Sequence, residues 1–104
     1  MRKFRKFKDT VIERLQDQEY ARTYLDVALE EYSKDHDTKS FFLALKDVAL
    51  AQGGLSKLAE HTNLNRSNLY GVLSGQNKAK LDTVHTILHG LGFRLDVQLI
   101  EKTA

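Results

Sequence analysis

Side chains able to read and hold nucleic acid gather between Leu64 and Leu81, a stretch with three basic residues and no acidic one. Arginine can form paired hydrogen bonds with guanine and asparagine with adenine, so a helix carrying both can distinguish bases in the major groove. We expect base-edge contacts from Asn65, Arg66, Ser67, Asn68 and Tyr70. We expect phosphate contacts from neighbouring polar and basic side chains, namely Ser56, Lys57, Gln76, Asn77, Lys78 and Lys80.

A helix-turn-helix would position these side chains, and its geometry makes demands at six positions. The first helix needs an apolar residue followed by a small one where the helices cross. The turn needs a residue that tolerates positive φ and then an apolar one, and the second helix needs two apolar anchors. The stretch 55–72 meets these demands with Leu58, Ala59, Asn63, Leu64, Leu69 and Val72. The alternative is an ordinary helical core with a polar outer face, because such patterns also arise by chance.

Helical periodicity extends over much of the remaining chain. Asp37 or Thr38 can cap the helix that carries Phe41 and Leu45, and Gly92 closes the helix that carries Ile87 and Leu88. Thr10 and Glu13 have the spacing of a capping box, which predicts that a short N-terminal helix begins there. The clearest apolar stripes cover residues 20–32, 41–49 and 82–91.

After Gly92 the period changes from helical to alternating, which predicts one β-strand with Phe93, Leu95, Val97 and Leu99 on its apolar side. A lone strand leaves its backbone groups unpaired, so we expect it to pair with its copy across a homodimer axis. The alternative is an extended tail packed on its own helices. The predicted fold is therefore mainly α, a helix-turn-helix domain of five or six helices with one C-terminal strand.

Charge is distributed unevenly along the chain, although its formal net value is only +2. Residues 1–8 form a basic arm with five basic residues and no acid, whereas residues 9–37 hold nine acidic and three basic residues. This acidic helical part, 9–36, precedes the helix-turn-helix core, 37–91, and the strand and tail, 92–104. Such asymmetry indicates one anionic and one cationic partner. We expect a cationic protein to contact Asp26, Glu30 and Glu31.

Several classes of site are excluded or disfavoured. The chain has no cysteine, which rules out disulfides and thiolate metal sites. No signal peptide or membrane-spanning run is visible, so we expect a cytoplasmic protein. His85 and His89 have a spacing compatible with metal binding, but no third ligand falls at a useful position. With no phosphate loop or nucleophile motif, we expect no cofactor, no metal and no enzymatic activity.

A family resemblance accompanies these patterns. The chain resembles the addiction-module antidote proteins, which are HigA-like antitoxins of the Xre/lambda-repressor helix-turn-helix superfamily, over roughly residues 20–98. Two positions depart from the family pattern: Asn63 stands where the turn glycine is usual, and Lys78 follows Asn77 where proline is frequent. The resemblance is carried by Leu58-Ala59, Asn63-Leu64, Ser67-Asn68-Leu69-Tyr70, Leu73-Ser74-Gly75 and Leu91-Gly92-Phe93-Arg94-Leu95.

The resemblance implies an antitoxin of a type II toxin-antitoxin module. Such proteins bind double-stranded operator DNA as homodimers, repress their own operon, and neutralise a small basic toxin of the RelE/ParE-like kind. One alternative is a stand-alone Xre-family repressor, such as a prophage protein, with no toxin partner. Another is a protein-interaction module that binds its partner but no DNA.

Overall fold

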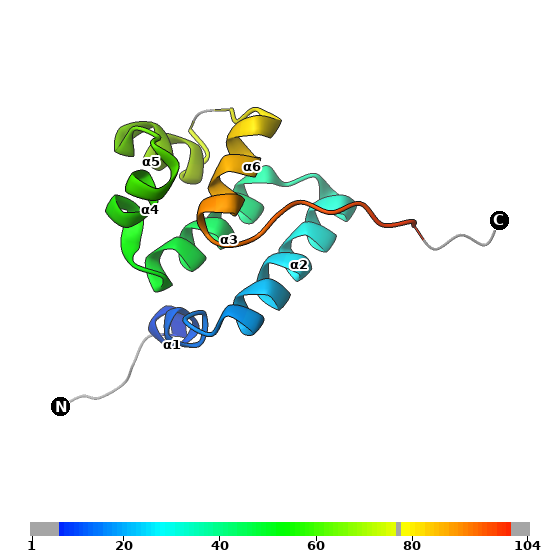
Figure 1. Ribbon diagram of the computed structural model, residues 1–104. Helices are drawn as coiled ribbons and strands as arrows, with labels where there is room; N and C mark the ends of the chain where they lie inside the picture. Colours follow the sequence, from blue (N-terminus) through cyan, green and yellow to red (C-terminus); the bar gives the residue numbers. More distant parts are fainter. Residues whose placement is uncertain (1–6, 77, 101–104) are drawn as a thin grey trace.

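The structure, a computed structural model, describes residues 7–76 and 78–100, except for the side chains of residues 7 and 8. The described residues form six α-helices and no β-strand, so the prediction of a mainly α fold with five or six helices is confirmed (Figure 1). In chain order the helices are α1 (Phe7–Arg14), α2 (Gln18–Asp35), α3 (Thr38–Ala51), α4 (Gly54–Thr62), α5 (Arg66–Leu73) and α6 (Leu81–Gly90).

Carboxylate caps set where α2 and α3 begin. Asp17 accepts a hydrogen bond from the Glu19 backbone N–H at 3.0 Å. Asp37, the predicted cap of α3, accepts from the Lys39 N–H at 3.1 Å and the Ser40 N–H at 3.4 Å. A hydrogen bond from the Ser40 hydroxyl, at 2.7 Å, contributes most to holding the pKa of Asp37 below its usual value. Because these caps satisfy backbone donors at the helix starts, they stop α2 and α3 from fraying.

The predicted start of the first helix is wrong. Helix α1 begins at Phe7, so Thr10 lies within the helix rather than at its N-terminal cap. The three residues before Thr10 include no proline or glycine, and nothing in them stops a helix from continuing upstream. Burial of Val11 and Leu15 then holds α1 against α3.

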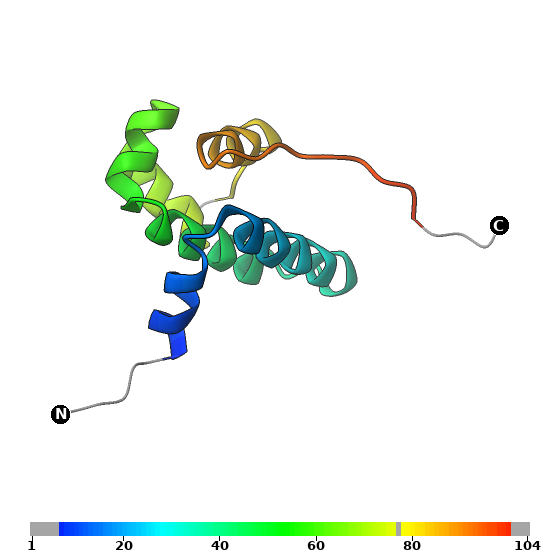
Figure 2. The ribbon, with the colours of Figure 1, turned by 60° about the horizontal axis from the view of Figure 1, so that its bottom comes forward.

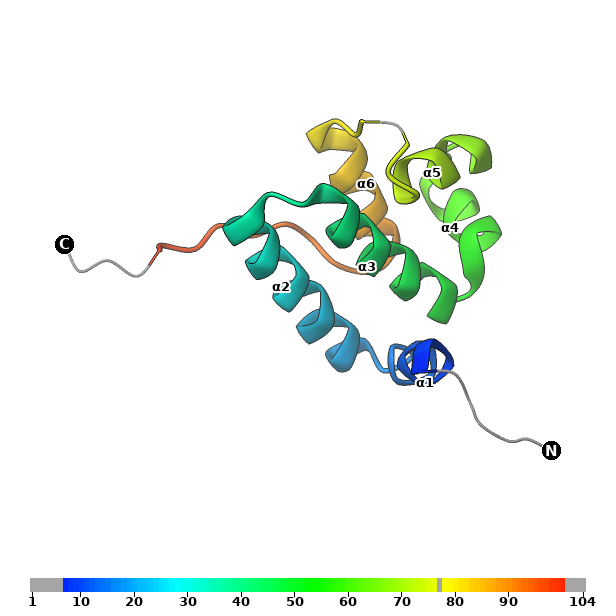
Figure 3. The same cartoon turned by 180° about the vertical axis from the view of Figure 1, so that it is seen from behind.

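Helix α3 lies at the centre of the fold and packs against α1, α2, α4 and α5 (Figure 3). Its predicted apolar face is buried and includes Phe41, Leu45 and Val48. Helix α6 joins this core through α4, and its Ile87 is fully buried. The helices that carry the candidate base-reading and toxin-facing residues are therefore held on opposite flanks of one shared helix.

One carboxylate is buried in this core. Asp47 of α3 is only 2% exposed, and the Tyr24 hydroxyl of α2 donates a hydrogen bond to it at 2.9 Å. Burial, and then this hydrogen bond, raises the pKa of Tyr24 to about 12. The pair adds a directional contact to the otherwise apolar packing of α2 on α3, because buried polar groups require partners.

The predicted C-terminal strand is not formed in the single chain. Residues 93–100 have an extended course without a strand assignment, and Figure 2 shows them leaving the end of α6 as an extended chain. The alternating pattern predicted a strand, and this prediction is wrong for the single chain because a strand requires a hydrogen-bonded neighbour. No neighbouring strand exists among the described residues of this chain.

The contact between α4 and α6 is tight at Gly90, and this generates a prediction. A Cβ atom at Gly90 would lie 2.6 Å from Thr62 Cγ2 and 3.0 Å from Leu58 Cδ1. We expect Gly90→Ala to lower the free energy of unfolding by about 1–3 kcal/mol, as overpacking does, although alanine is the better helix former. Urea unfolding followed by circular dichroism measures this change.

Thr62→Ser is the matched companion variant, because it removes Cγ2 and keeps the hydroxyl that donates to the Leu58 carbonyl at 2.8 Å. Gly90→Ala should cost less in the Thr62→Ser background than in the parent chain. Equal costs in both backgrounds would show that the contact between Gly90 and Thr62 does not limit the packing.

The Tyr24–Asp47 pair predicts a loss of stability at alkaline pH. The Tyr24 pKa rises from 10.0 to about 12 in the fold, so its contribution is complete below pH 10 and is lost as the pH approaches 12. We expect the free energy of unfolding to fall less steeply over this range in Tyr24→Phe than in the parent chain. Urea titrations at several pH values measure both slopes. Identical slopes would show that Tyr24 does not titrate differently on folding.

Candidate nucleic-acid interface

The turn between α4 and α5 has the geometry that the sequence predicts. Asn63 has φ 61° and ψ 18°, which is the left-handed conformation expected at this position. Its backbone N–H donates to the Ala59 carbonyl at 2.9 Å and closes the end of α4. The Thr62 hydroxyl then accepts from the Leu64 N–H at 3.2 Å, so side-chain hydrogen bonds set the path of the chain into α5.

Asn65 caps α5. Its side-chain oxygen accepts from the Ser67 N–H at 2.7 Å and from the Asn68 N–H at 3.3 Å. These bonds occupy the amide oxygen of Asn65. In this conformation its candidate role as a base reader is limited to the amide nitrogen, whereas the exposed Arg66 guanidinium offers donors and the exposed Asn68 amide offers a donor and an acceptor.

Helix α5 has one buried side and one exposed side. Leu69 is only 1% exposed, and Val72 is also buried, as a helix-turn-helix register demands. Leu58 is buried in α4, and Ala59 and Leu64 pack against the same core, so all six demanded positions are occupied as predicted. The opposite side of α5 is exposed and carries Arg66, Ser67, Asn68 and Tyr70.

The candidate phosphate-contacting residues flank this exposed side. Ser56 and Lys57 are exposed near the start of α4. Gln76, Lys78 and Lys80 are exposed in the segment between α5 and α6, and Asn77 lies outside the described residues. Gly75 provides the turn after α5 with a φ of 83°, a conformation that other residues rarely adopt.

Two lysines of α3 reach the same region and were missed by the sequence analysis. The Lys39 side chain runs beside Gly75, because a Cβ atom built there would lie 2.9 Å from Lys39 Cγ. The Lys46 ammonium lies 5.3 Å from the centre of the Tyr70 ring, a cation–π distance. Both lysines fall off the buried stripe of α3, which was the available signal, but only the packing of α3 against α5 places them beside the candidate site.

Tyr70 remains 51% exposed under this contact. Its ring is therefore oriented by a cation from a neighbouring helix while one side stays open to a ligand. The exposed residues of α5 form, with Lys39 and Lys46 of α3 and the exposed Lys78 and Lys80 that follow α5 in the chain, a basic surface that we call the α5 surface.

The two candidate metal-binding histidines lie on one helix side. The ring centroids of His85 and His89 are 6.0 Å apart on α6. Within residues 7–76 and 78–100, no cluster of three or more histidine, cysteine, aspartate or glutamate side chains is positioned to hold a metal ion.

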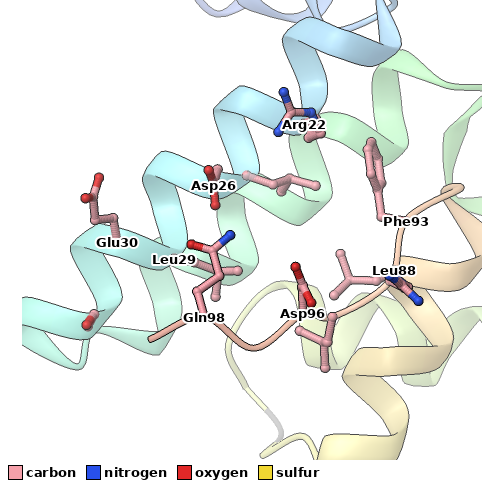
Figure 4. A pocket seen from close by; sticks show the side chains of 12 residues that line it. Arg22, Asp26, Leu29, Glu30, Leu88, Phe93, Asp96 and Gln98 are labelled. Carbon is pink, nitrogen blue, oxygen red and sulfur yellow. The ribbon is translucent and has the colours of Figure 1, made fainter. Parts of the chain in front are cut away.

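The candidate toxin-facing acids lie on the exposed side of α2, away from α5. Asp26 and Glu30 line a cleft of about 480 Å³ whose opposite wall is the extended segment 93–98 (Figure 4). Glu31 is exposed beside them but does not line the cleft. Leu25, Leu29 and Leu88 give the cleft an apolar lining, so it combines a charged rim with a surface that can accept apolar side chains.

Comparison with known proteins identifies the family. The family model described as "Probable addiction module antidote protein" matches residues 3–99. The chain belongs to this family. No curated protein and no solved structure matches the chain.

The family assignment bears directly on function. An addiction module antidote has a cognate toxin, and antidotes are typically not enzymes. The described helices include none that is long and apolar enough to cross a membrane.

Proposed function

We propose that this antidote binds operator DNA as a homodimer, represses its own operon, and neutralises a small basic toxin of the RelE/ParE-like kind in the cytoplasm. The observation that carries the DNA-binding part is the exposed, acid-free side of α5, which is flanked by lysines from two other parts of the chain, α3 and residues 78–80. The family assignment carries the antitoxin part.

The shape of α5 suits a major groove. An α-helix with its side chains is about 10–12 Å across, which is close to the width of that groove, so the exposed side of α5 can enter it. Its first turn presents Arg66, Ser67 and Asn68 together with the positive end of the helix dipole. Arg66 is the candidate for paired hydrogen bonds to guanine, and Asn68 is the candidate for adenine.

The lysines around α5 supply the sequence-independent part of the affinity. Lysine–phosphate contacts release counterions, so each contact steepens the loss of affinity with salt. We assign phosphate contacts to Ser56, Lys57, Gln76, Asn77, Lys78 and Lys80, and we add Lys39 because it lies beside Gly75. Among these residues only the lysines release counterions. In a homodimer the two α5 helices would read half-sites about 34 Å apart.

The acidic side of α2 is the proposed toxin-binding surface. Asp26, Glu30 and Glu31 are exposed there, in a part of the chain where acidic residues outnumber basic ones by three to one. Complementary charge speeds association with a basic protein and selects against acidic ones. The adjoining apolar cleft can add buried contact area to these charges.

A stand-alone repressor without a toxin is the second candidate function. The α5 surface supports it equally well, since both functions require the same DNA contacts. The antidote family assignment favours the first. A small basic protein that is encoded beside this gene and copurifies with the chain would distinguish the two.

The DNA-binding proposal predicts two kinds of variant. Arg66→Ala should weaken operator binding by about 1–3 kcal/mol and relax specificity at one base position. Lys78→Ala and Lys80→Ala should weaken binding to all sequences and reduce the salt slope by roughly one unit each. Gel retardation of the upstream DNA, repeated at several salt concentrations and with base-substituted sites, measures both effects.

Lys34→Ala is the matched control. Lys34 is exposed in the last turn of α2, so its substitution removes the same charge at a site away from α5. Its affinity and salt slope should equal those of the parent chain. If Arg66→Ala behaves like Lys78→Ala and Lys80→Ala, the division into base-reading and phosphate-contacting residues is wrong. Failure of the parent chain to retard DNA from upstream of its gene contradicts the DNA-binding proposal itself.

The toxin-binding proposal predicts that Asp26→Lys, Glu30→Lys and Glu31→Lys together abolish rescue of growth when the chain is coexpressed with the small basic protein encoded beside its gene. Like charges would then face each other across the interface. DNA retardation should be unchanged, because α2 and α5 occupy different flanks of α3. Asp9→Lys, which changes an exposed acid on α1, should leave rescue intact. Rescue that survives the triple reversal would place the toxin on another surface.

A further inference from the structure

The apolar side of the C-terminal segment is half packed and half exposed. Phe93 and Leu95 pack partly buried against the core. Val97 and Leu99 continue the same alternation but are 93% and 98% exposed. Exposed apolar side chains in an extended segment with free backbone groups favour pairing with another strand.

We propose that two copies of this chain pair through antiparallel segments 93–97 in one register, in which Leu95 lies opposite its own copy. This inference rests on the homodimer of the proposed function and specifies its interface. In this register Arg94 lies opposite the Asp96 of the second copy, and the two-fold axis repeats the pair. Phe93 lies opposite Val97, so apolar side chains meet on one side and opposite charges on the other.

Charge selects this register among the alternatives. Registers offset by one residue place the apolar side of one copy against the polar side of the other. Centring the pair on Arg94 brings two guanidinium groups together, and centring it on Asp96 brings two carboxylates together. Centring it on Val97 leaves Arg94 opposite Ile100 and Asp96 opposite Gln98, without an ion pair. Directly opposed unlike charges stabilise antiparallel pairs, and like charges destabilise them.

Arg94 and Asp96 are available for this pairing. Both side chains are exposed, and within the described part of the chain neither forms a salt bridge. The Asp96 carboxylate accepts only a local hydrogen bond from the Val97 N–H, at 2.9 Å, among the described residues. A carboxylate oxygen can accept further donors, so this bond leaves room for a guanidinium.

The pairing brings apolar side chains of the two copies together beside the core. Paired strands lie about 4.8 Å apart with their side chains on shared sides. The Val97 of the second copy would therefore lie beside Phe93, which packs partly buried against the core. The pairing buries part of the Val97 side chain, which the single chain leaves 93% exposed.

Charge exchange tests the proposed pairing. In Arg94→Asp, two acids face each other at both symmetric positions, so we expect the dimer dissociation constant to rise about tenfold or more. Asp96→Arg should have the same effect with two arginines. Mixing the two variants restores both ion pairs in a heterodimer, and the double variant Arg94→Asp/Asp96→Arg restores them in a homodimer. Analytical ultracentrifugation of the full-length chain measures these states, with Lys34→Asp as the control.

Cysteine cross-linking tests the register, because the parent chain has no cysteine. Directly opposed residues have Cα atoms about 4.5–5.5 Å apart, within the range of a disulfide. Leu95→Cys should therefore cross-link to its copy on oxidation. In the proposed register two Val97 positions are offset by four residues, about 13 Å, so Val97→Cys should not cross-link.

Three outcomes would overturn the inference. They are cross-linking through Val97→Cys but not through Leu95→Cys, an Arg94→Asp dimer as tight as the parent dimer, and a parent chain that is monomeric throughout the concentration range. These measurements contain neither DNA nor toxin. Operator retardation and growth rescue, measured separately, decide the DNA-binding and toxin-binding parts of the proposed function independently of this result.

Discussion

Burial of one side of α3 is the constraint on which the rest of the structure depends. Leu45 and Val48 are fully buried, and the helix packs against α1, α2, α4 and α5. Because core side chains are packed at crystal-like density, the helices around α3 have little freedom to shift relative to one another. The directions in which α5 and α2 present their outer sides follow from that packing.

This central helix also contributes polar groups to both flanks. Toward α2 it supplies Asp47, which accepts from the Tyr24 hydroxyl. Toward α5 it supplies Lys46 above the Tyr70 ring and Lys39 beside Gly75. Helix α3 thus helps to hold α2 in place and supplies part of the positive charge beside α5.

The separation of the two flanks has a functional consequence under the proposed function. Helices α5 and α2 lie on different sides of α3, as Figures 1 and 3 show. A toxin bound on α2 would not cover the α5 surface, so one antidote molecule can carry a toxin and contact DNA together. The segment 93–98 lines the α2 cleft, so the proposed dimer contact and the proposed toxin contact share a boundary.

Short-range rules in the sequence determined the helix-turn-helix. The cap at Asn65, the left-handed turn at Asn63 and the anchors Leu58 and Leu69 all involve residues within a few positions of one another, so spacing alone predicts them. The strand predicted after Gly92 is absent, because a strand depends on a neighbour that the described residues of one chain do not supply. Only the tertiary structure decided that Asp47 is buried beside Tyr24 and that Lys39 and Lys46 join the α5 surface. Those contacts join residues more than twenty positions apart, and local spacing carries no information about which helix sides will meet.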